Sequence, residues 1–262
     1  MCKDKVEVAI NRLKTASEMS LEYYQKPLMI AYSGGKDSDC ILQLALMAGI
    51  PIEIVNSHTT ADAPETVKYI RKRFYDLELK GYTVKIEKPF YKGKRTSMWD
   101  LIPKKKMPPT RMVRYCCSIL KETSGQNRHI ATGVRWEEST KRKTTRGIYE
   151  TIARNKDKRI ILNNDNDDKR KLFEVCQMQG KTVTNPIIDW SNTEVIDFNK
   201  EYVKTCNPLY CMGFQRVGCI GCPMTGKKRY TEFRIYPKYK QMYIKAFDRL
   251  VDVLRQQNCT IN

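Results

Sequence analysis

The chain has 262 residues, of which 48 are lysine or arginine and 29 are acidic, so its formal net charge is +19. Its 41% hydrophobic content fits a globular protein, and no apolar stretch approaches the roughly 20 residues of a membrane span. The first residues have the pattern of an amphipathic helix rather than of a signal peptide, so we expect a soluble, cytoplasmic protein without membrane association. So basic a surface attracts polyanions, either nucleic acid or nucleotides.

Hydrophobic patterning along the first half of the chain predicts strands that alternate with helices. Residues 28–33 form a short apolar run before Gly34 and Gly35, which is typical of a buried strand entering a tight turn. Further strands are expected at 52–55, 82–86 and 129–134, with helices at 37–48 and 64–79. This alternation predicts an α/β fold with a parallel twisted sheet and helices on both faces.

The second half of the chain is less regular. Residues 140–182 are charged and rich in Asn, Asp and Lys, so we expect an insertion or a mobile loop there. Helices are predicted over 192–204 and 229–257, on either side of a Gly- and Cys-rich loop at 206–226. The expected domains are a nucleotide-binding α/β domain over 1–205 and a cysteine-cluster loop with a C-terminal helical region over 206–262.

A glycine-rich loop connects the predicted strand at 28–33 to the predicted helix at 37–48. Glycines let backbone amides approach phosphate oxygens, and the start of a helix adds N–H donors and a favourable dipole. Lys36 supplies a positive charge, and Asp37 could help to hold Mg²⁺ beside the phosphates. The Gly-x-x-x-x-Gly-Lys spacing of a Walker motif is missing. The predicted phosphate-binding residues are Ser33, Gly34, Gly35, Lys36, Asp37 and Ser38.

Ten cysteines is a high number for a chain without a visible export signal, and six of them fall in two groups. The groups are Cys116 with Cys117, and Cys206, Cys211, Cys219 and Cys222. A Cys-x-x-Cys turn presents two thiolates to one metal site, and four thiolates without histidine suit either structural zinc or an iron–sulfur cluster. The expected ligands are Cys116, Cys117, Cys219 and Cys222.

The run SGGKDS at Ser33–Ser38 resembles the PP-loop of the ATP pyrophosphatase superfamily, the adenine nucleotide alpha hydrolase-like proteins, whose members cleave ATP between the α and β phosphates. Three further segments are similar to the phosphoadenosine phosphosulfate (PAPS) reductase family within that superfamily. They lie at 58–66, 133–139 and 185–190. The resemblance extends over residues 27 to 225.

The resemblance implies that these loops face the nucleotide at the carboxyl ends of the strands. His58 and Gly133 would then contact the nucleotide, and Arg135 would meet a phosphate or sulfate group. The tandem cysteines with a distant Cys-x-x-Cys are similar to the [4Fe–4S] arrangement of adenylyl-sulfate reductases. In related DNA-phosphorothioation sulfurtransferases the cysteines crowd near this loop, so that Cys211 could replace Cys116 as a ligand.

Two departures from the reductase pattern favour ATP as the nucleotide. Reductases of the family carry a degraded PP-loop and a Glu-Cys-Gly tail, whereas SGGKDS is intact here and Cys259 has different neighbours. We therefore expect cleavage of ATP to AMP and pyrophosphate, with Mg²⁺, Lys36, Asp37 and Arg135 in the catalytic roles, to activate a substrate for sulfur transfer. Reduction of adenylyl sulfate or PAPS to sulfite is one alternative, and a non-catalytic nucleotide- or nucleic-acid-binding subunit is another.

Basic residues gather in three places that could bind a nucleic acid, either DNA or tRNA. The clusters are Lys104–Lys106 with Arg111 and Arg114, Lys141–Lys143 with Arg146, and Lys227–Arg229. The alternative is a basic surface that only keeps the protein soluble. Sulfur transfer would also require a donor, which could be a second protein.

Overall fold

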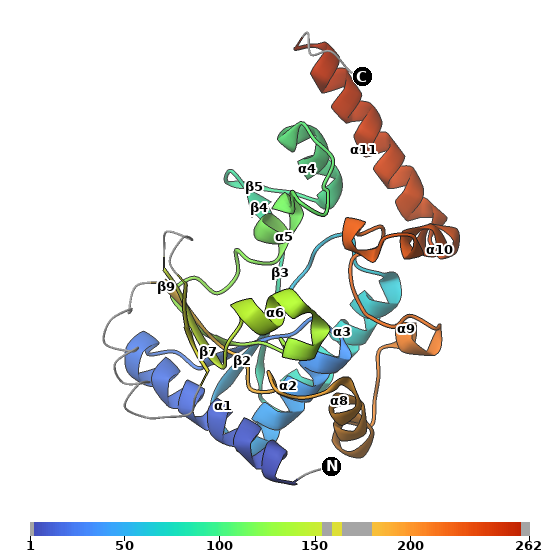
Figure 1. Ribbon diagram of the computed structural model, residues 1–262. Helices are drawn as coiled ribbons and strands as arrows, with labels where there is room; N and C mark the ends of the chain where they lie inside the picture. Colours follow the sequence, from blue (N-terminus) through green and yellow to red (C-terminus); the bar gives the residue numbers. More distant parts are fainter. Residues whose placement is uncertain (1–2, 154–158, 164–179, 258–262) are drawn as a thin grey trace. The chain divides into compact units, whose positions relative to one another are not determined.

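The computed structural model describes residues 3–153, 159–163 and 180–257, and it divides the chain into two compact units (Figure 1). The sheet unit comprises Met1–Asn56, Lys68–Lys85 and Gly125–Arg216. The helical unit comprises Ser57–Val67, Ile86–Ser124 and Val217–Asn262. The expected division at 205/206 differs from this arrangement, because residues 57–67 and 86–124 pack with the C-terminal part of the chain.

The sheet unit is built on a seven-stranded sheet with the order β3-β2-β1-β6-β9-β7-β8. Strand β1 pairs in parallel with β2 and β6, and β6 pairs in parallel with β9, whereas β7 is antiparallel to both β9 and β8. The strands are β1 (Leu28–Ala31), β2 (Ile52–Ser57), β3 (Thr83–Glu87), β6 (His129–Ala131), β7 (Tyr149–Ala153), β8 (Arg159–Leu162) and β9 (Gly180–Thr184). The predicted α/β class is confirmed.

Regular structure occupies most of the described residues of the stretch 140–182, which the sequence predicts to be an insertion or a mobile loop. It contains a short helix, α6, and the strands β7 and β8, and it includes the start of β9. Both β7 and β8 extend the sheet at one edge, because β7 pairs along its whole length with β9. Residues 154–158 and 164–179 of the stretch lie outside the described part of the chain.

Helices of the sheet unit pack on the apolar side chains of the central strands. Leu28 and Ile30 of β1 alternate with residues on the opposite face, and both are fully buried in one core with Leu13, Ile41 and Leu44. The helices and helical turns are α1 (Lys3–Tyr24), α2 (Lys36–Ala48), α3 (Pro64–Glu78), η1 (Trp136–Glu138), α6 (Thr140–Thr145), α8 (Asn192–Phe198), η2 (Asn199–Val203) and α9 (Pro208–Cys211). None of the helices described in either unit has the length and apolar character that crossing a bilayer requires.

The helical unit has its own core. Trp99 of α4 packs edge-on against Tyr243 of α11, with ring centroids 4.7 Å apart, and Leu101, Ala246 and Leu250 are buried around them. The elements are β4 (Phe90–Tyr91), β5 (Lys94–Arg95), α4 (Met98–Lys105), α5 (Tyr115–Leu120), η3 (Pro223–Thr225), α10 (Lys228–Ile235) and α11 (Pro237–Arg255). The expected helical region after the cysteine loop is therefore split into two helices.

A buried histidine in the sheet makes stability depend on pH. His129 is fully buried, its Nε2 lies 2.7 Å from Thr184 Oγ1, and burial lowers its pKa to about 3. The unfolded chain, with a histidine pKa near 6.5, then binds a proton that the folded chain excludes, so acidification below that value favours unfolding.

We expect the free energy of unfolding to fall by about 2 kcal/mol more in the wild type than in His129→Gln between pH 8 and pH 5. Glutamine keeps a partner for Thr184 and does not titrate, and the other ionisable groups are common to both proteins. Urea unfolding at the two pH values measures the difference. Parallel pH dependence in the two proteins would show that His129 is protonated in the folded state.

Candidate functional site

The loop between β1 and α2 has the shape that its sequence predicts. Gly34 has φ +71°, in the left-handed region that glycine adopts without strain. Ser38 closes the turn, because its Oγ accepts from the Gly35 amide at 3.1 Å and donates to the Gly35 carbonyl at 2.8 Å. Ser33 Oγ donates to Ser38 Oγ at 3.3 Å. Ser38 is thus buried, and its hydrogen bonds stabilise the turn. Ser33 is the more exposed of the two serines.

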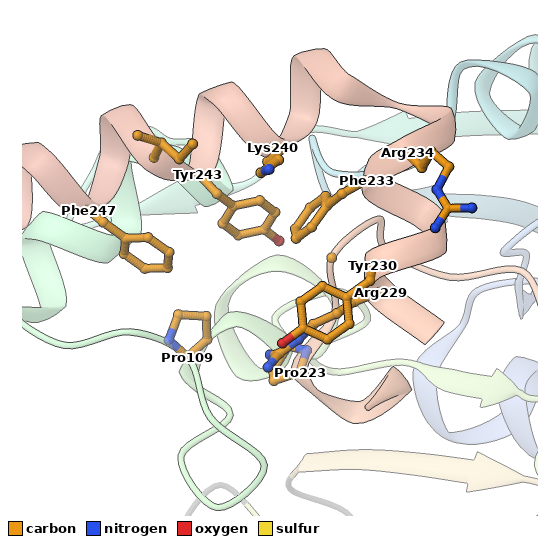
Figure 2. Close-up of a pocket in the computed structure, with 11 residues that line it drawn as sticks. Pro109, Pro223, Arg229, Tyr230, Phe233, Arg234, Lys240, Tyr243 and Phe247 are labelled. Carbon is orange, nitrogen blue, oxygen red and sulfur yellow. The ribbon is translucent and has the colours of Figure 1, made fainter. Parts of the chain in front are cut away.

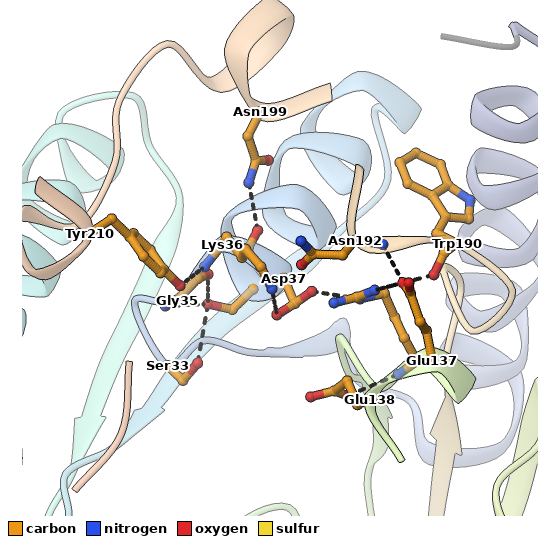
Figure 3. Close-up of polar contacts among 12 residues, drawn as sticks. Ser33, Gly35, Lys36, Asp37, Glu137, Glu138, Trp190, Asn192, Asn199 and Tyr210 are labelled. Carbon is orange, nitrogen blue, oxygen red and sulfur yellow. Dashed lines mark hydrogen bonds and ion pairs between the residues drawn. The ribbon is translucent and has the colours of Figure 1, made fainter. Parts of the chain in front are cut away.

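Charged side chains meet at the first turn of α2 (Figure 3). Lys36 Nζ lies 3.0 Å from Asp37 Oδ2, and Arg135 Nε donates to Asp37 Oδ1 at 2.7 Å. The Arg135 Nη1 also donates to Glu137 Oε2 at 3.1 Å and to the Trp190 carbonyl at 3.3 Å. Arg135 is only 2% exposed, so it contacts Asp37 from the protein interior and not from the solvent side. Its predicted contact with a phosphate or sulfate stays a prediction.

Gly133 allows the chain after β6 to approach α2 closely. A Cβ atom at this position would lie 2.9 Å from the Asp37 carbonyl carbon and oxygen, which is closer than real Cβ atoms come to backbone. The Gly133 position therefore tolerates no side chain unless Asp37 moves. Its link to the loop is a close backbone approach, and its direct contact with a nucleotide stays a prediction.

Three polar side chains hold the loop from the segment after β9. The Lys36 amide donates to the Tyr210 hydroxyl at 2.9 Å, and Asn199 Nδ2 donates to the Lys36 carbonyl at 2.8 Å. The buried Asn207 donates from Nδ2 to the Gly34 carbonyl at 2.9 Å. No motif in the sequence marks these three residues as partners of the loop. Asn207 before Pro208 is a signal for a helix start, but it does not indicate which loop the asparagine contacts.

A cavity of about 860 Å³ borders the same loop. Asp39 on its wall accepts from the Tyr32 hydroxyl at 2.6 Å and from the Tyr69 hydroxyl at 3.1 Å, and burial raises its pKa to about 6. The volume lies within the usual range of small-ligand sites. Its other lining residues include Lys36, Asn199, Lys200, Lys204, Cys206 and Tyr210.

The cysteine site lies within the helical unit. The Cys219 thiol donates to Thr59 Oγ1 at 3.4 Å, and the Ile220 amide donates to the Ala61 carbonyl at 2.8 Å, so the Cys-x-x-Cys loop pairs with the loop after β2. Gly221 has φ +73°, and a Cβ there would lie 2.6 Å from Phe233 and Tyr243 ring atoms. The turn between the two cysteines therefore requires glycine.

Two cations, Arg114 and Lys121, and the carboxylate of Asp62 act on the thiols of this site. Arg114 Nη2 donates to Cys117 Sγ at 3.2 Å, and the pKa of Cys117 is lowered to about 5, first by hydrogen bonding from Cys116 and then by Arg114. The pKa of Cys116 is raised by that same hydrogen bond, by burial and by the charges of Cys117, Cys219 and Cys222. Cys219 in turn raises the pKa of Lys121. The charges of the other three predicted ligands therefore all act on the Cys116 thiol.

Comparison with known protein families shows to which family the chain belongs. The model of the phosphoadenosine phosphosulfate reductase domain matches residues 27–225. The chain belongs to the PAPS reductase family. Two uncharacterized proteins of Methanocaldococcus jannaschii, MJ0973 and MJ0066, are each 27% identical to it, over 86% and 90% of its residues. The chain spans 47% and 43% of those proteins, about half of their length.

Two solved structures are similar at low identity. The phosphate complex of phosphoadenylyl-sulfate reductase from Candida auris is 16% identical, with a TM-score of 0.48, and the match covers 84% of this chain and 96% of that one. The U34-tRNA thiolase NcsA from Methanococcus maripaludis, with its [4Fe–4S] cluster, is 13% identical, with a TM-score of 0.44, and the match covers 99% of this chain and 82% of that one.

The remaining segments that resemble the PAPS reductase family have mainly structural contacts. His58 lies in the helical unit, 3.4 Å from Asp62, and its contact with a nucleotide stays a prediction. Asn185 is fully buried and donates to the Gly147 carbonyl at 2.7 Å and to Glu150 at 2.8 Å. Asp189 pairs with Arg12 of α1 at 2.9 Å. This last segment thus ties β9 to its neighbours in the sheet unit.

Two further cysteines, Cys211 and Cys259, are candidates for a role in the chemistry. Cys211 ends α9 in the sheet unit and is exposed, beside Cys206, whereas the four predicted ligands belong to the helical unit. Its substitution for Cys116 as a ligand stays a prediction that metal analysis can test. Cys259 lies outside the described residues.

Proposed function

We propose that this PAPS reductase-family chain binds ATP at the Ser33–Ser38 loop and cleaves it to AMP and pyrophosphate, activating a nucleic-acid substrate for sulfur transfer. The observation that carries the proposal is the complete loop at the start of α2, with Lys36 and Asp37 beside a cavity of ligand size. Backbone and lysine donors at a helix start suit a phosphate chain, and PP-loop enzymes use them to hold ATP.

Lys36, Asp37 and Arg135 would have different roles in this reaction. Lys36 would leave Asp37 Oδ2 and turn to the phosphates, which frees that carboxylate oxygen for Mg²⁺. Arg135, bonded to the other oxygen, would keep Asp37 in place during this exchange. A substrate oxygen would attack the α phosphorus, the bond to the bridging oxygen would break, and pyrophosphate would leave. A sulfur nucleophile would then displace AMP from the activated carbon.

The cysteines fit an iron–sulfur cluster by the chemistry of their donor set. Each thiolate of a [4Fe–4S] cluster binds a different iron, so four mutually interacting thiols can hold one without meeting at a single point. Within the described parts of the chain no three His, Cys, Asp or Glu side chains converge on one metal-ion position. Cys116, Cys117, Cys219 and Cys222 would be the ligands, and Arg114 and Lys121 would offset the negative charge. A cluster held by all four thiolates would have no open iron, so binding of the sulfur donor to an iron would require one of these thiolates to leave.

Product analysis tests the proposal. Anaerobically purified protein is mixed separately with ATP and with adenylyl sulfate, with tRNA or DNA added to parallel ATP samples, and pyrophosphate, AMP and sulfite are quantified. We expect pyrophosphate from ATP, with more when the nucleic acid substrate is present. Sulfite from adenylyl sulfate would instead identify a reductase, and neither product would identify a non-catalytic binding subunit.

Gly133→Ala tests the close approach behind the loop. We expect pyrophosphate production to fall on the order of 10- to 100-fold, because the new methyl group displaces Asp37. Gly49→Ala is the matched control, since Gly49 ends the same helix with φ +64° and a Cβ there meets nothing within 4 Å. The control should lose about 1 kcal/mol of stability and keep its activity. Equal activity in the two variants would refute a role for this approach.

A further inference from the structure

A pocket of about 650 Å³ opens between α10, α11 and the Cys-x-x-Cys turn of the helical unit (Figure 2). Gly221 and Pro223 line it, and these residues flank Cys222 in the sequence. The Tyr243 ring belongs to its wall and is held by a hydrogen bond from its hydroxyl to the Ile220 carbonyl at 3.0 Å. The pocket is therefore continuous with the turn that carries two of the predicted cluster ligands.

Aromatic and basic side chains together line much of this pocket. Tyr230 is 64% exposed, Phe247 is 37% exposed, and the Arg229 guanidinium lies 5.5 Å from the centroid of the Tyr230 ring. Arg234 and Lys240 add positive charge, and none of the residues that line the pocket is acidic. Residues 227–255, which include both helices, contain nine lysines and arginines against three acidic residues.

The pocket is a better candidate for a nucleic-acid contact than the basic cluster at 141–146. In the cluster at 141–146, Arg142 pairs with Glu138, and Arg146 lies 2.8 Å from the buried Glu150. Those arginines stabilise the fold of the sheet unit. At 229–234, by contrast, Arg229 and Arg234 line a pocket together with the exposed ring of Tyr230. Rings with adjacent arginines bind unpaired bases by stacking while the cations contact the phosphates.

We propose that this pocket binds an unpaired segment of RNA, with a base stacked on Tyr230 and with Arg229, Arg234 and Lys240 on the adjoining phosphates. The charge of the lining favours a polyanion over an apolar peptide, and its concave aromatic surface favours a base that is already unstacked. RNA loops present such bases, whereas duplex DNA keeps them inside the helix. The role of this pocket in sulfur transfer rests on the proposed function. A base bound here would lie beside Cys222, one of the expected cluster ligands.

Fluorescence anisotropy of a labelled oligouridylate of about 12 nucleotides tests binding on the full chain without ATP. We expect Tyr230→Ala to weaken binding roughly 10-fold or more, and Tyr230→Phe to retain it. Tyr75→Ala is the matched control, because Tyr75 is 61% exposed but lies in the sheet unit. Arg234→Gln should lower the slope of log affinity against log salt by about one.

Equal losses in Tyr230→Ala and Tyr75→Ala would overturn the assignment of the pocket. Equal or tighter binding of oligothymidylate or of an RNA duplex would overturn the choice of unpaired RNA, and full displacement of the probe by polyglutamate at matched charge would overturn base stacking. Since the assay contains no ATP, failure of pyrophosphate release leaves its result unchanged. Conversely, a chain that cleaves ATP but binds no oligonucleotide would refute this inference alone.

Discussion

Replacing Lys36 by alanine is expected to lower pyrophosphate release from ATP by about 100- to 1000-fold. The ammonium group lies at the first turn of α2, 3.0 Å from Asp37, where it can shift to the phosphate chain as negative charge builds up on the leaving pyrophosphate. The pair is partly exposed, so its loss should change the free energy of unfolding by less than about 1 kcal/mol. Initial rates of pyrophosphate release and thermal unfolding measure the two effects separately.

Lys200→Ala is the control for Lys36→Ala. Lys200 lines the same cavity from η2 but lies outside the loop. Its replacement by alanine removes the same charge as Lys36→Ala does. We expect this variant to keep its rate within a few-fold of the wild type. If both variants retained full activity, the Ser33–Ser38 loop would not be the site of ATP cleavage.

Serine at Cys117 or at Cys219 is expected to reduce bound iron from about four atoms per chain to less than one. A hydroxyl is a poor iron ligand, whereas serine at 219 can still donate to Thr59, so the loop should keep its fold. Iron and acid-labile sulfide are measured after anaerobic purification, together with visible absorbance. These readouts do not depend on catalytic activity.

Two other cysteine variants sharpen the test. Cys206→Ser should keep the full iron content, because Cys206 is exposed in the sheet unit. Cys211→Ser tests the alternative ligand set. Loss of iron in this variant would identify Cys211 as a ligand in place of Cys116. Full iron in both Cys117→Ser and Cys219→Ser would exclude the proposed cluster site.

Features that depend on neighbouring residues could be predicted from the sequence. The apolar run 28–31, the glycine at φ +71° and the helix that follows are one continuous segment, so local patterning predicts the loop and its place after a strand. The same holds for the Cys219–Cys222 turn, whose Gly221 allows the two cysteines to follow a tight bend.

Features that depend on distant residues could not be predicted. Residues 58–66 read as a loop near a nucleotide, yet their described contacts include the cysteine turn almost 160 residues later. Nothing local distinguishes Tyr210 or Asn207 as partners of the loop at 33–38. The stretch at 140–182 is predicted to be an insertion or a mobile loop because its charged composition, rich in Asn, Asp and Lys, masks the short strands β7 and β8. The pairing of these two strands orders the part of the stretch that the structure describes.

The pairing of Ile220 with Ala61 also has a consequence for the order of events during synthesis. About a hundred residues separate Cys117 from Cys219, and at roughly 5–20 residues per second the ribosome needs about 5–20 s to add them. Throughout that interval Cys116 and Cys117 are made but their partners are not, and the backbone of Ala61 has no strand to pair with. If the proposed cluster forms, iron delivered early could meet only half of its four expected ligands. Assembly of the cysteine site is therefore a late step in the biogenesis of this protein, after the strands of the central sheet have been translated.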